Sequence, residues 1–231
     1  MRARFLFVLT TLGWLLLQGL QAQVVSYTFG STSSPTTGAA TVAANLTAST
    51  FASFTGSGTT GINSPGSSTA GGGGGAYFTA TNWRSADGNY LYFTLTPANG
   101  FQLNLSSFSF YYASTGTGPT SATLSSSADG YASALGSYSL TQQSGGSLLA
   151  SDWHQAGSSI TLSALTGTVF RLSATGASGS TGSFRVDAVT LNGTVSAISE
   201  PSTYAAAAGL LGLLIVGWQR HRAQRQGASP R

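Results

Sequence analysis

The sequence predicts an all-β fold, an antiparallel β-sandwich of jelly-roll-like type, followed by a single C-terminal transmembrane helix. Apolar and polar residues alternate with a period of two in many short segments, and turn residues separate these segments. Before Tyr204, no ten-residue stretch shows the apolar period of a helix. Many short strands at near-regular spacing are typical of β-sandwiches.

The clearest predicted strand runs from Asn89 to Thr96. Leucine and phenylalanine at positions 91, 93 and 95 fall on one face, and tyrosine and threonine at 90, 92 and 94 fall on the other. Asn99-Gly100 follows as a turn, because both residues tolerate positive φ. Further strands are expected at 24–29, 76–81, 101–112, 120–125, 137–142, 159–162, 168–174 and 184–192. We therefore assign the sandwich body to residues 76–198.

The preceding segment, 23–75, is predicted to be the loop-like N-terminal part of the ectodomain. It is dominated by Gly, Ser, Thr and Ala, and it ends in five consecutive glycines at 71–75. Its only large side chains beyond residue 31 are those of Leu46, Phe51, Phe54 and Ile62. We expect long loops with one or two strands around 45–54. The glycine run lacks the lysine and the strand-loop-helix context of a phosphate-binding loop.

Residues 1–22 have the pattern of a secretory signal peptide. Arg2 and Arg4 precede an apolar stretch from Phe5 to Leu17, and small residues then lead to a predicted cleavage after Ala22. Leu20 is bulkier than the residue that this cleavage site prefers, so an uncleaved signal anchor is the alternative. Either way, the sequence predicts export.

The charges exclude a nucleic-acid-binding body. The formal net charge is +4 and the isoelectric point is near 9.7. Between the two hydrophobic ends, however, three arginines face five acidic residues, a net charge of −2. A nucleic-acid groove needs clustered Arg and Lys, and the chain has no lysine. The excess positive charge lies at the two ends of the chain, where it sets membrane topology.

The C-terminal region joins an apolar stretch, Ala205–Trp218, to a basic tail at 219–231. Fourteen residues span about 21 Å as a helix, less than the ~30 Å of a hydrocarbon core. Tyr204 and the snorkelling of Arg220 and Arg222 lengthen this to a marginal crossing, predicted over 204–218. Arg220, Arg222 and Arg225 would form its basic stop. A buried helix of a soluble domain is the alternative.

The end of the chain resembles a PEP-CTERM sorting domain. The resemblance rests on the motif at 199–204, with Glu200, Pro201, Ser202 and Thr203, and on the apolar stretch and the arginine tail behind it. It implies export to the bacterial cell envelope, recognition by an exosortase-type transpeptidase and cleavage near Glu200-Pro201. It also implies a periplasmic ectodomain anchored in the inner membrane, released to the cell surface or exopolysaccharide matrix after processing. Ser199 stands where the family usually has its first proline.

Catalytic and metal sites are not expected. The chain has no cysteine, and the mature body has one histidine, His154, without a nucleophile elbow to complete a triad. Its aspartates do not form the paired carboxylates of a glycosidase. Asp187 is a candidate calcium ligand, but no aspartate cluster accompanies it. The sequence therefore predicts a protein without enzymatic activity, cofactor or metal.

Two functions remain open. The first is a structural or adhesive envelope protein of the exopolysaccharide or biofilm matrix. The alternative is a lectin-like surface module, since sandwiches of this type bind sugars on exposed aromatic rings. Trp83 and Trp153 are the candidate glycan-stacking residues. The tyrosines at 90, 92, 111 and 112 are further candidates.

Overall fold

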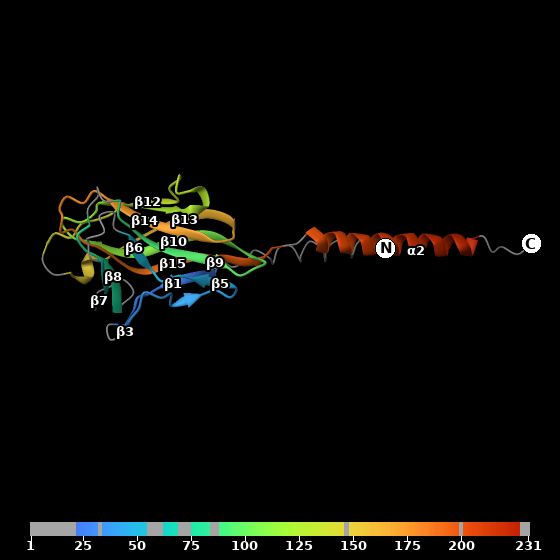
Figure 1. Cartoon of the computed structure of the whole chain (residues 1–231), viewed down its shortest axis with the longest axis horizontal. Helices are drawn as coiled ribbons and strands as arrows, with labels where there is room; N and C mark the ends of the chain where they lie inside the picture. Colours follow the sequence, from blue (N-terminus) through green and yellow to red (C-terminus); the bar gives the residue numbers. More distant parts are fainter. Residues whose placement is uncertain are drawn as a thin grey trace, which may run out of the picture. The chain divides into compact units, whose positions relative to one another are not determined.

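Two antiparallel β-sheets pack face to face in the body of the protein, as the computed structural model shows (Figure 1). The structure describes residues 22–31, 34–54, 62–68, 75–83, 88–145, 148–198 and 201–226. The chain divides into two compact units, the first ending at Ser196 and the second beginning at Ala197. Apart from Ala22, the predicted signal peptide lies outside the described residues.

The first sheet has seven strands. Their order is β13 (His154–Leu165), β10 (Phe101–Ser114), β15 (Phe184–Ala197), β1 (Ala22–Tyr27) and β4 (Thr41–Val42), while β8 (Gly75–Ala80) pairs with β15 and with β7 (Ile62–Ser68). The long strand β15 therefore has β10 along one edge, and β1 and β8 share the other edge.

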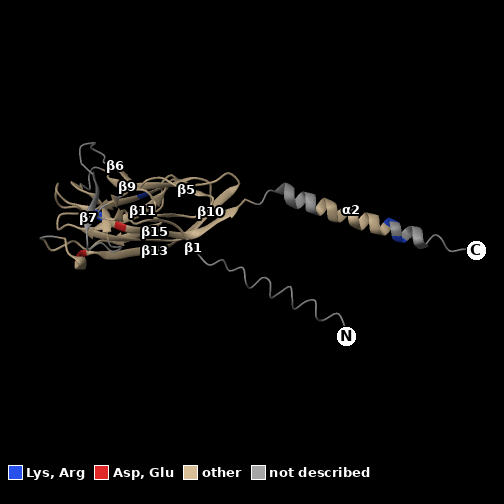
Figure 2. Cartoon of the chain, turned by 90° about the horizontal axis from the view of Figure 1, so that it is seen from below, with Lys and Arg blue, Asp and Glu red and all other residues tan. Residues whose placement is uncertain are grey.

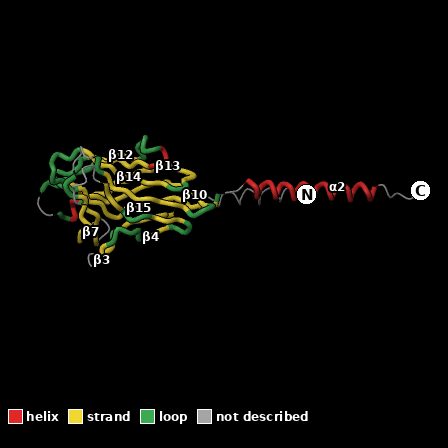
Figure 3. The backbone as a smooth tube through the Cα atoms, viewed as in Figure 1, coloured by secondary structure: helices red, strands yellow, loops and turns green. Residues whose placement is uncertain are grey.

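The second sheet has six strands. Their order is β12 (Gly136–Ser139), β11 (Ser121–Ser126), β14 (Thr168–Thr175), β9 (Tyr90–Pro97) and β5 (Leu46–Ala48), and β6 (Ala52–Phe54) also pairs with β9. The short strands β2 (Gly30–Ser31) and β3 (Ser34–Pro35) form a separate pair. Two 3₁₀ turns, η2 (Ser127–Asp129) and η3 (Ala150–Asp152), lie in the connections. Strands dominate the described body in Figure 3.

The predicted β-sandwich is confirmed: the body consists of antiparallel strands in two facing sheets. Strand β13 starts at His154, five residues before the predicted start at Ser159, because its first residues pair with Tyr111 and Tyr112 of β10. The segment predicted as loop-like supplies short strands to both sheets, including β5 and β6 within the expected range. Strands β5 and β6 both pair with β9, and Leu46 of β5 is buried in the core.

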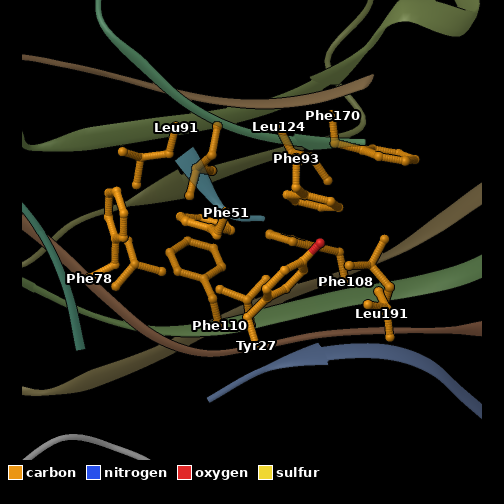
Figure 4. Packing of buried hydrophobic residues seen from close by; sticks show 14 of the residues in the cluster. Tyr27, Phe51, Phe78, Leu91, Phe93, Phe108, Phe110, Leu124, Phe170 and Leu191 are labelled. Carbon is orange, nitrogen blue, oxygen red and sulfur yellow. The ribbon is translucent and has the colours of Figure 1, made fainter. Parts of the chain in front are cut away.

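Aromatic rings fill the space between the sheets (Figure 4). Phe51 is 2% exposed, and its ring lies 5.5 Å from Tyr27, 5.2 Å from Phe78 and 5.8 Å from Phe93. Tyr27 and Phe78 belong to the seven-stranded sheet and Phe93 to the six-stranded sheet, so Phe51 touches both. Phe93 in turn stacks on Phe170 at 5.3 Å. Rings at these separations add about 0.5–1.5 kcal/mol per pair to the stabilisation from burial.

The second unit contains the helix α2 (Pro201–Gln226). Its start at Pro201 fits the fixed φ of proline, which suits the first turn of a helix. Large apolar side chains from Leu210 to Trp218 are all exposed, and Arg222 lies 4.9 Å from the Trp218 ring. The prediction of a transmembrane helix over 204–218 finds no support, because no helix in the described part of the chain is both long and apolar enough to cross a membrane. The apolar run is too short and the basic residues Arg220 and Arg222 continue the same helix.

Burial of tyrosine hydroxyls predicts a loss of stability at alkaline pH. Tyr27 is fully buried, its hydroxyl donates to the Ser49 carbonyl at 2.9 Å, and burial raises its pKa. Burial also raises the pKa of Tyr138. An unfolded tyrosine ionises near pH 10, so this stabilisation is complete below about pH 10 and is lost as pH rises further. We expect the free energy of unfolding to fall above about pH 10, and to fall less steeply in Tyr27→Phe.

Urea unfolding between about pH 9 and 11 measures this effect, with Tyr111→Phe on the outer face as the control substitution. Equal losses of free energy in Tyr27→Phe and the unsubstituted protein would show that the buried hydroxyl does not govern the alkaline transition.

Candidate functional site

The two tryptophans predicted to stack on glycans are not free to do so. Trp83 is 2% exposed, and its indole nitrogen donates to the Ala174 carbonyl at 2.9 Å. Trp153 is 8% exposed and packs edge-on against Tyr77 at 5.2 Å. Both rings are covered by the protein, which corrects their assignment as sugar platforms. Of the tyrosines considered with them, Tyr112 is also buried.

Aromatic residues instead gather on the outer face of the six-stranded sheet. Along β9, Leu91 and Phe93 point into the core, so Tyr90 and Tyr92 point outward by strand alternation. The partner of Tyr90 across the strand pair is Phe54 of β6, and the two rings stack at 4.9 Å with 17° between their planes. The ring centres of Tyr90 and Tyr92 are 5.9 Å apart, and the angle between the ring planes is 65°.

Arg171 lies within this aromatic group. It is opposite Tyr92 in the β14–β9 register, and its neighbours Phe170 and Leu172 are buried, so its side chain projects from the outer face. The guanidinium carbon is 4.4 Å from the centre of the Tyr90 ring and 3.6 Å from that of Tyr131. Each such cation–π contact contributes about 0.5–2 kcal/mol, depending on burial. Phe54, Tyr90, Arg171 and Tyr131 thus form one continuous column, which together with Tyr92 we name the aromatic face.

Tyr131 reaches this position through the connection that follows η2. It adopts φ +67°, and its backbone amide donates to the Ser126 carbonyl at 2.8 Å. Asp129 holds the same turn, since its Oδ2 accepts from the Ser133 amide at 2.9 Å. Hydrogen bonding to Ser133 lowers the pKa of the Asp129 carboxyl. Asp129 is therefore a positioning residue for the turn that carries Tyr131.

Hydroxyl side chains lie beside the aromatic face on this side of the sheet. The strand registers place Ser125 opposite Arg171, and Ser173 opposite Tyr90. Thr123 and Ser137 continue the second of these rows across β11 and β12. Flat rings beside small hydroxyls suit a ligand with both apolar faces and polar groups, as a sugar has.

Few charged groups occur in the body (Figure 2). Within its described part, the positive side chains are Arg171 and Arg185. The Arg171 Nε is buried and has no hydrogen-bond partner there. The rings of Tyr90 and Tyr131 hold its guanidinium in place.

Asp152, Asp187 and His154 contact neighbouring residues of the body. The Asp152 Oδ2 accepts from the Leu149 amide at 2.7 Å, and the buried Asp187 accepts from the Ala188 amide at 2.6 Å. His154 packs its ring 5.6 Å from Tyr112. Among the described residues, no three His, Cys, Asp or Glu side chains come together in a way that would hold a metal ion. The candidate calcium ligand Asp187 thus belongs to no such group in that part of the chain.

The residues predicted to form a sorting motif lie at the edge of the described part of the chain. Glu200 lies outside the described residues, and Pro201, Ser202 and Thr203 begin the backbone of α2. Arg220, Arg222 and Arg225 continue the same helix.

The similarities of this chain to known proteins are found among solved structures. No family model matches the chain, and no match was found among curated proteins. Among solved structures, the CBM22-1–GH10 modules of Clostridium thermocellum xylanase 10B complexed with xylohexaose align at 15% identity and TM-score 0.46, over 78% of this chain and 30% of that one. The K1 cleaved adhesin domain of Lys-gingipain from Porphyromonas gingivalis W83 aligns at 15% identity and TM-score 0.43, over 78% of this chain and 100% of that one.

CBM35 from Cellvibrio japonicus Abf62 aligns at 19% identity and TM-score 0.37, over 61% of this chain and 87% of that one. This chain spans less than a third of the xylanase chain. Because all three TM-scores are below 0.5, they assign neither a fold family nor a function to the protein.

Proposed function

We propose that the protein is an exported, non-enzymatic cell-envelope protein whose β-sandwich body attaches to polysaccharide through the aromatic face. The observation that carries this proposal is the column of Phe54, Tyr90, Arg171 and Tyr131 on the outside of a sheet. A ring column that served the core alone would lie between the sheets, as that of Phe51 and Phe93 does. Strands β8 to β11, and again β12 to β15, alternate between the sheets, which also favours the jelly-roll type predicted from the sequence.

Sugar binding follows from the chemistry of this face. Phe54 is 48% exposed and Tyr90 stacks on one face of its ring, so a pyranose ring would stack on the other face. Tyr92 adds a second ring together with a hydroxyl group. Arg171 would donate hydrogen bonds to ring or exocyclic oxygens, and to a carboxylate in an acidic polysaccharide. Sugar binding of this kind would be sufficient for an adhesive role in the exopolysaccharide matrix.

The second part of the proposal concerns sorting. Residues 199–231 would act as a PEP-CTERM-like signal, delivered to the inner membrane and recognised by an exosortase-type transpeptidase. The support is the order of Glu200-Pro201, the apolar stretch and the arginines, together with a helix that is its own unit with exposed Leu210 to Trp218. The body would face the periplasm before processing and the cell surface or matrix after it.

A polysaccharide array tests the binding part of the proposal. We expect the full-length protein, in a neutral detergent, to bind at least one polysaccharide from a panel of dextran, mannan, xylan, alginate and polygalacturonate. Tyr92→Ala and Phe54→Ala should each weaken that binding about tenfold, equivalent to about 1.4 kcal/mol. Loss of a sugar-stacking ring is the cause.

Tyr111→Ala, which removes a half-buried tyrosine from the other sheet, is the matched control and should leave binding unchanged. If the protein binds none of these polysaccharides, only a structural role in the matrix remains. If Tyr92→Ala, Phe54→Ala and Tyr111→Ala all bind equally well, the aromatic face is not the binding site.

Intact-mass measurement tests the sorting part. Protein recovered from the source cells should end near Glu200 or Pro201 if a transpeptidase processes it. A mass that still includes Arg220 to Arg231 would rule out processing at this motif. Glu200→Gln and Pro201→Ala should then increase the unprocessed fraction, whereas Gln219→Ala, beyond the motif, should not.

A further inference from the structure

A groove of about 450 Å³ lies on the opposite sheet, away from the aromatic face. Hydroxyl and amide side chains line it along the outer side of β10, β13 and β15: Asn104, Ser106, Ser159, Thr161, Ser163 and Thr194. Leu105, Ile160, Leu162 and Gly193 complete the lining. We name it the hydroxyl groove. Alternation in β13 supports this placement, since Ile160 is buried in the core while its neighbours Ser159 and Thr161 are exposed.

Two β-bulges shape the groove. Between Leu103 and Ser107 of β10, the partner strand β13 twice carries one extra residue. Bulges bend a strand and re-aim its side chains, often beside binding sites. Ala164, in the first bulge, has φ +56°, and its amide donates to the Asn104 Oδ1 at 2.9 Å. This hydrogen bond to the side chain of Asn104 stabilises the bend in β13.

The far wall of the groove depends on a close approach of strands. A side chain on Gly193 would collide with the Asn104 carbonyl, so β15 lies unusually close to β10 at this point. The Ser106 hydroxyl donates to the neighbouring Asn192 carbonyl at 3.1 Å. These contacts fix one side of the groove, while Thr161, Ser163 and Thr194 remain exposed for a ligand.

The lining contains hydrogen-bond donors and acceptors but no charged side chain. A ligand that matches it is a neutral polyol chain of sugar units, because a charged ligand would lose its hydration without a counter-charge. An apolar ligand would displace water from the exposed hydroxyls of Thr161, Ser163 and Thr194 and offer them no hydrogen bond in return.

We infer that the hydroxyl groove is a second glycan-binding site, specific for neutral sugar chains, and that the body is bivalent. This inference rests on the proposed function for its account of the first site. The groove and the aromatic face lie on the outer sides of two sheets that pack core to core, so one short chain does not reach both. A body that holds one polysaccharide strand on each side cross-links the matrix.

Native mass spectrometry of the full-length protein, released from detergent, tests the inference. The probes are four neutral hexasaccharides: cellohexaose, xylohexaose, maltohexaose and mannohexaose. With at least one probe, the protein should bind two molecules per chain. Thr161→Lys, which fills the groove, and Tyr92→Ala should each reduce this to one, and the double variant should bind none.

Gln155→Lys is the matched control, since it adds the same charge to an exposed position of β13 outside the groove, and it should retain two molecules. Thr161→Ser keeps the hydroxyl and should also retain two. Thermal unfolding checks that every variant is folded.

The outcomes separate the two claims. If the unsubstituted protein binds one hexasaccharide, and this is lost in Tyr92→Ala but kept in Thr161→Lys, the groove is not a binding site. The proposed function then still stands. One molecule with the reverse pattern retains the groove but overturns bivalency for neutral chains, since the aromatic face then binds none of these four probes. No binding of any probe counts against the groove, and two molecules in Thr161→Lys overturn it directly.

Discussion

The packing of the Phe51 ring between the two sheets is the interaction on which the rest of the body depends. The chain has no cysteine and only 6% charged residues, so neither disulfides nor extensive ion pairing can hold the sheets together. Stability must come from apolar burial, and Phe51 makes ring contacts with both sheets. Phe51 lies in the short connection between β5 and β6. Its packing therefore holds this connection against the six-stranded sheet, together with Phe54 at the end of β6.

Side chains on one face of each sheet pack in the core, and those on the other face lie at the surface. On the six-stranded sheet the outward positions carry the aromatic face, and on the seven-stranded sheet they carry the hydroxyl groove. The hydroxyl groove has no charged side chain and the aromatic face has one, Arg171, so neither surface has the clustered Arg and Lys that nucleic acid requires. The positive charge of the chain instead belongs to its two ends, where it serves export and sorting in our proposal.

Sequence patterns predicted the strands well, because a two-residue period in apolar side chains is a direct sign of a half-buried sheet. The same period could have identified Arg171, which stands between the inward-facing Phe170 and Leu172. It could not assign Trp83 and Trp153, which lie outside the strands, and there a large aromatic residue is as easily buried as exposed. Both rings proved to be covered.

Other features depend on contacts between distant segments. Phe51 and Phe54 are three residues apart in a stretch of small residues, yet one is buried and the other is 48% exposed. Tyr131 joins the aromatic face through a turn that Asp129 holds, and no periodic pattern marks that turn. The hydroxyl groove requires bulges in β13 and the close approach at Gly193, both of which arise only when the strands pair.

The central claim is that the Phe51 packing joins the sheets and so positions both outer faces. Comparison of Phe51→Ala with Phe54→Ala by equilibrium urea unfolding tests it most directly, because the same side chain is removed three residues apart. We expect Phe51→Ala to lower the free energy of unfolding by about 3–5 kcal/mol and Phe54→Ala by less than about 1 kcal/mol. Similar small losses in both variants would contradict the claim.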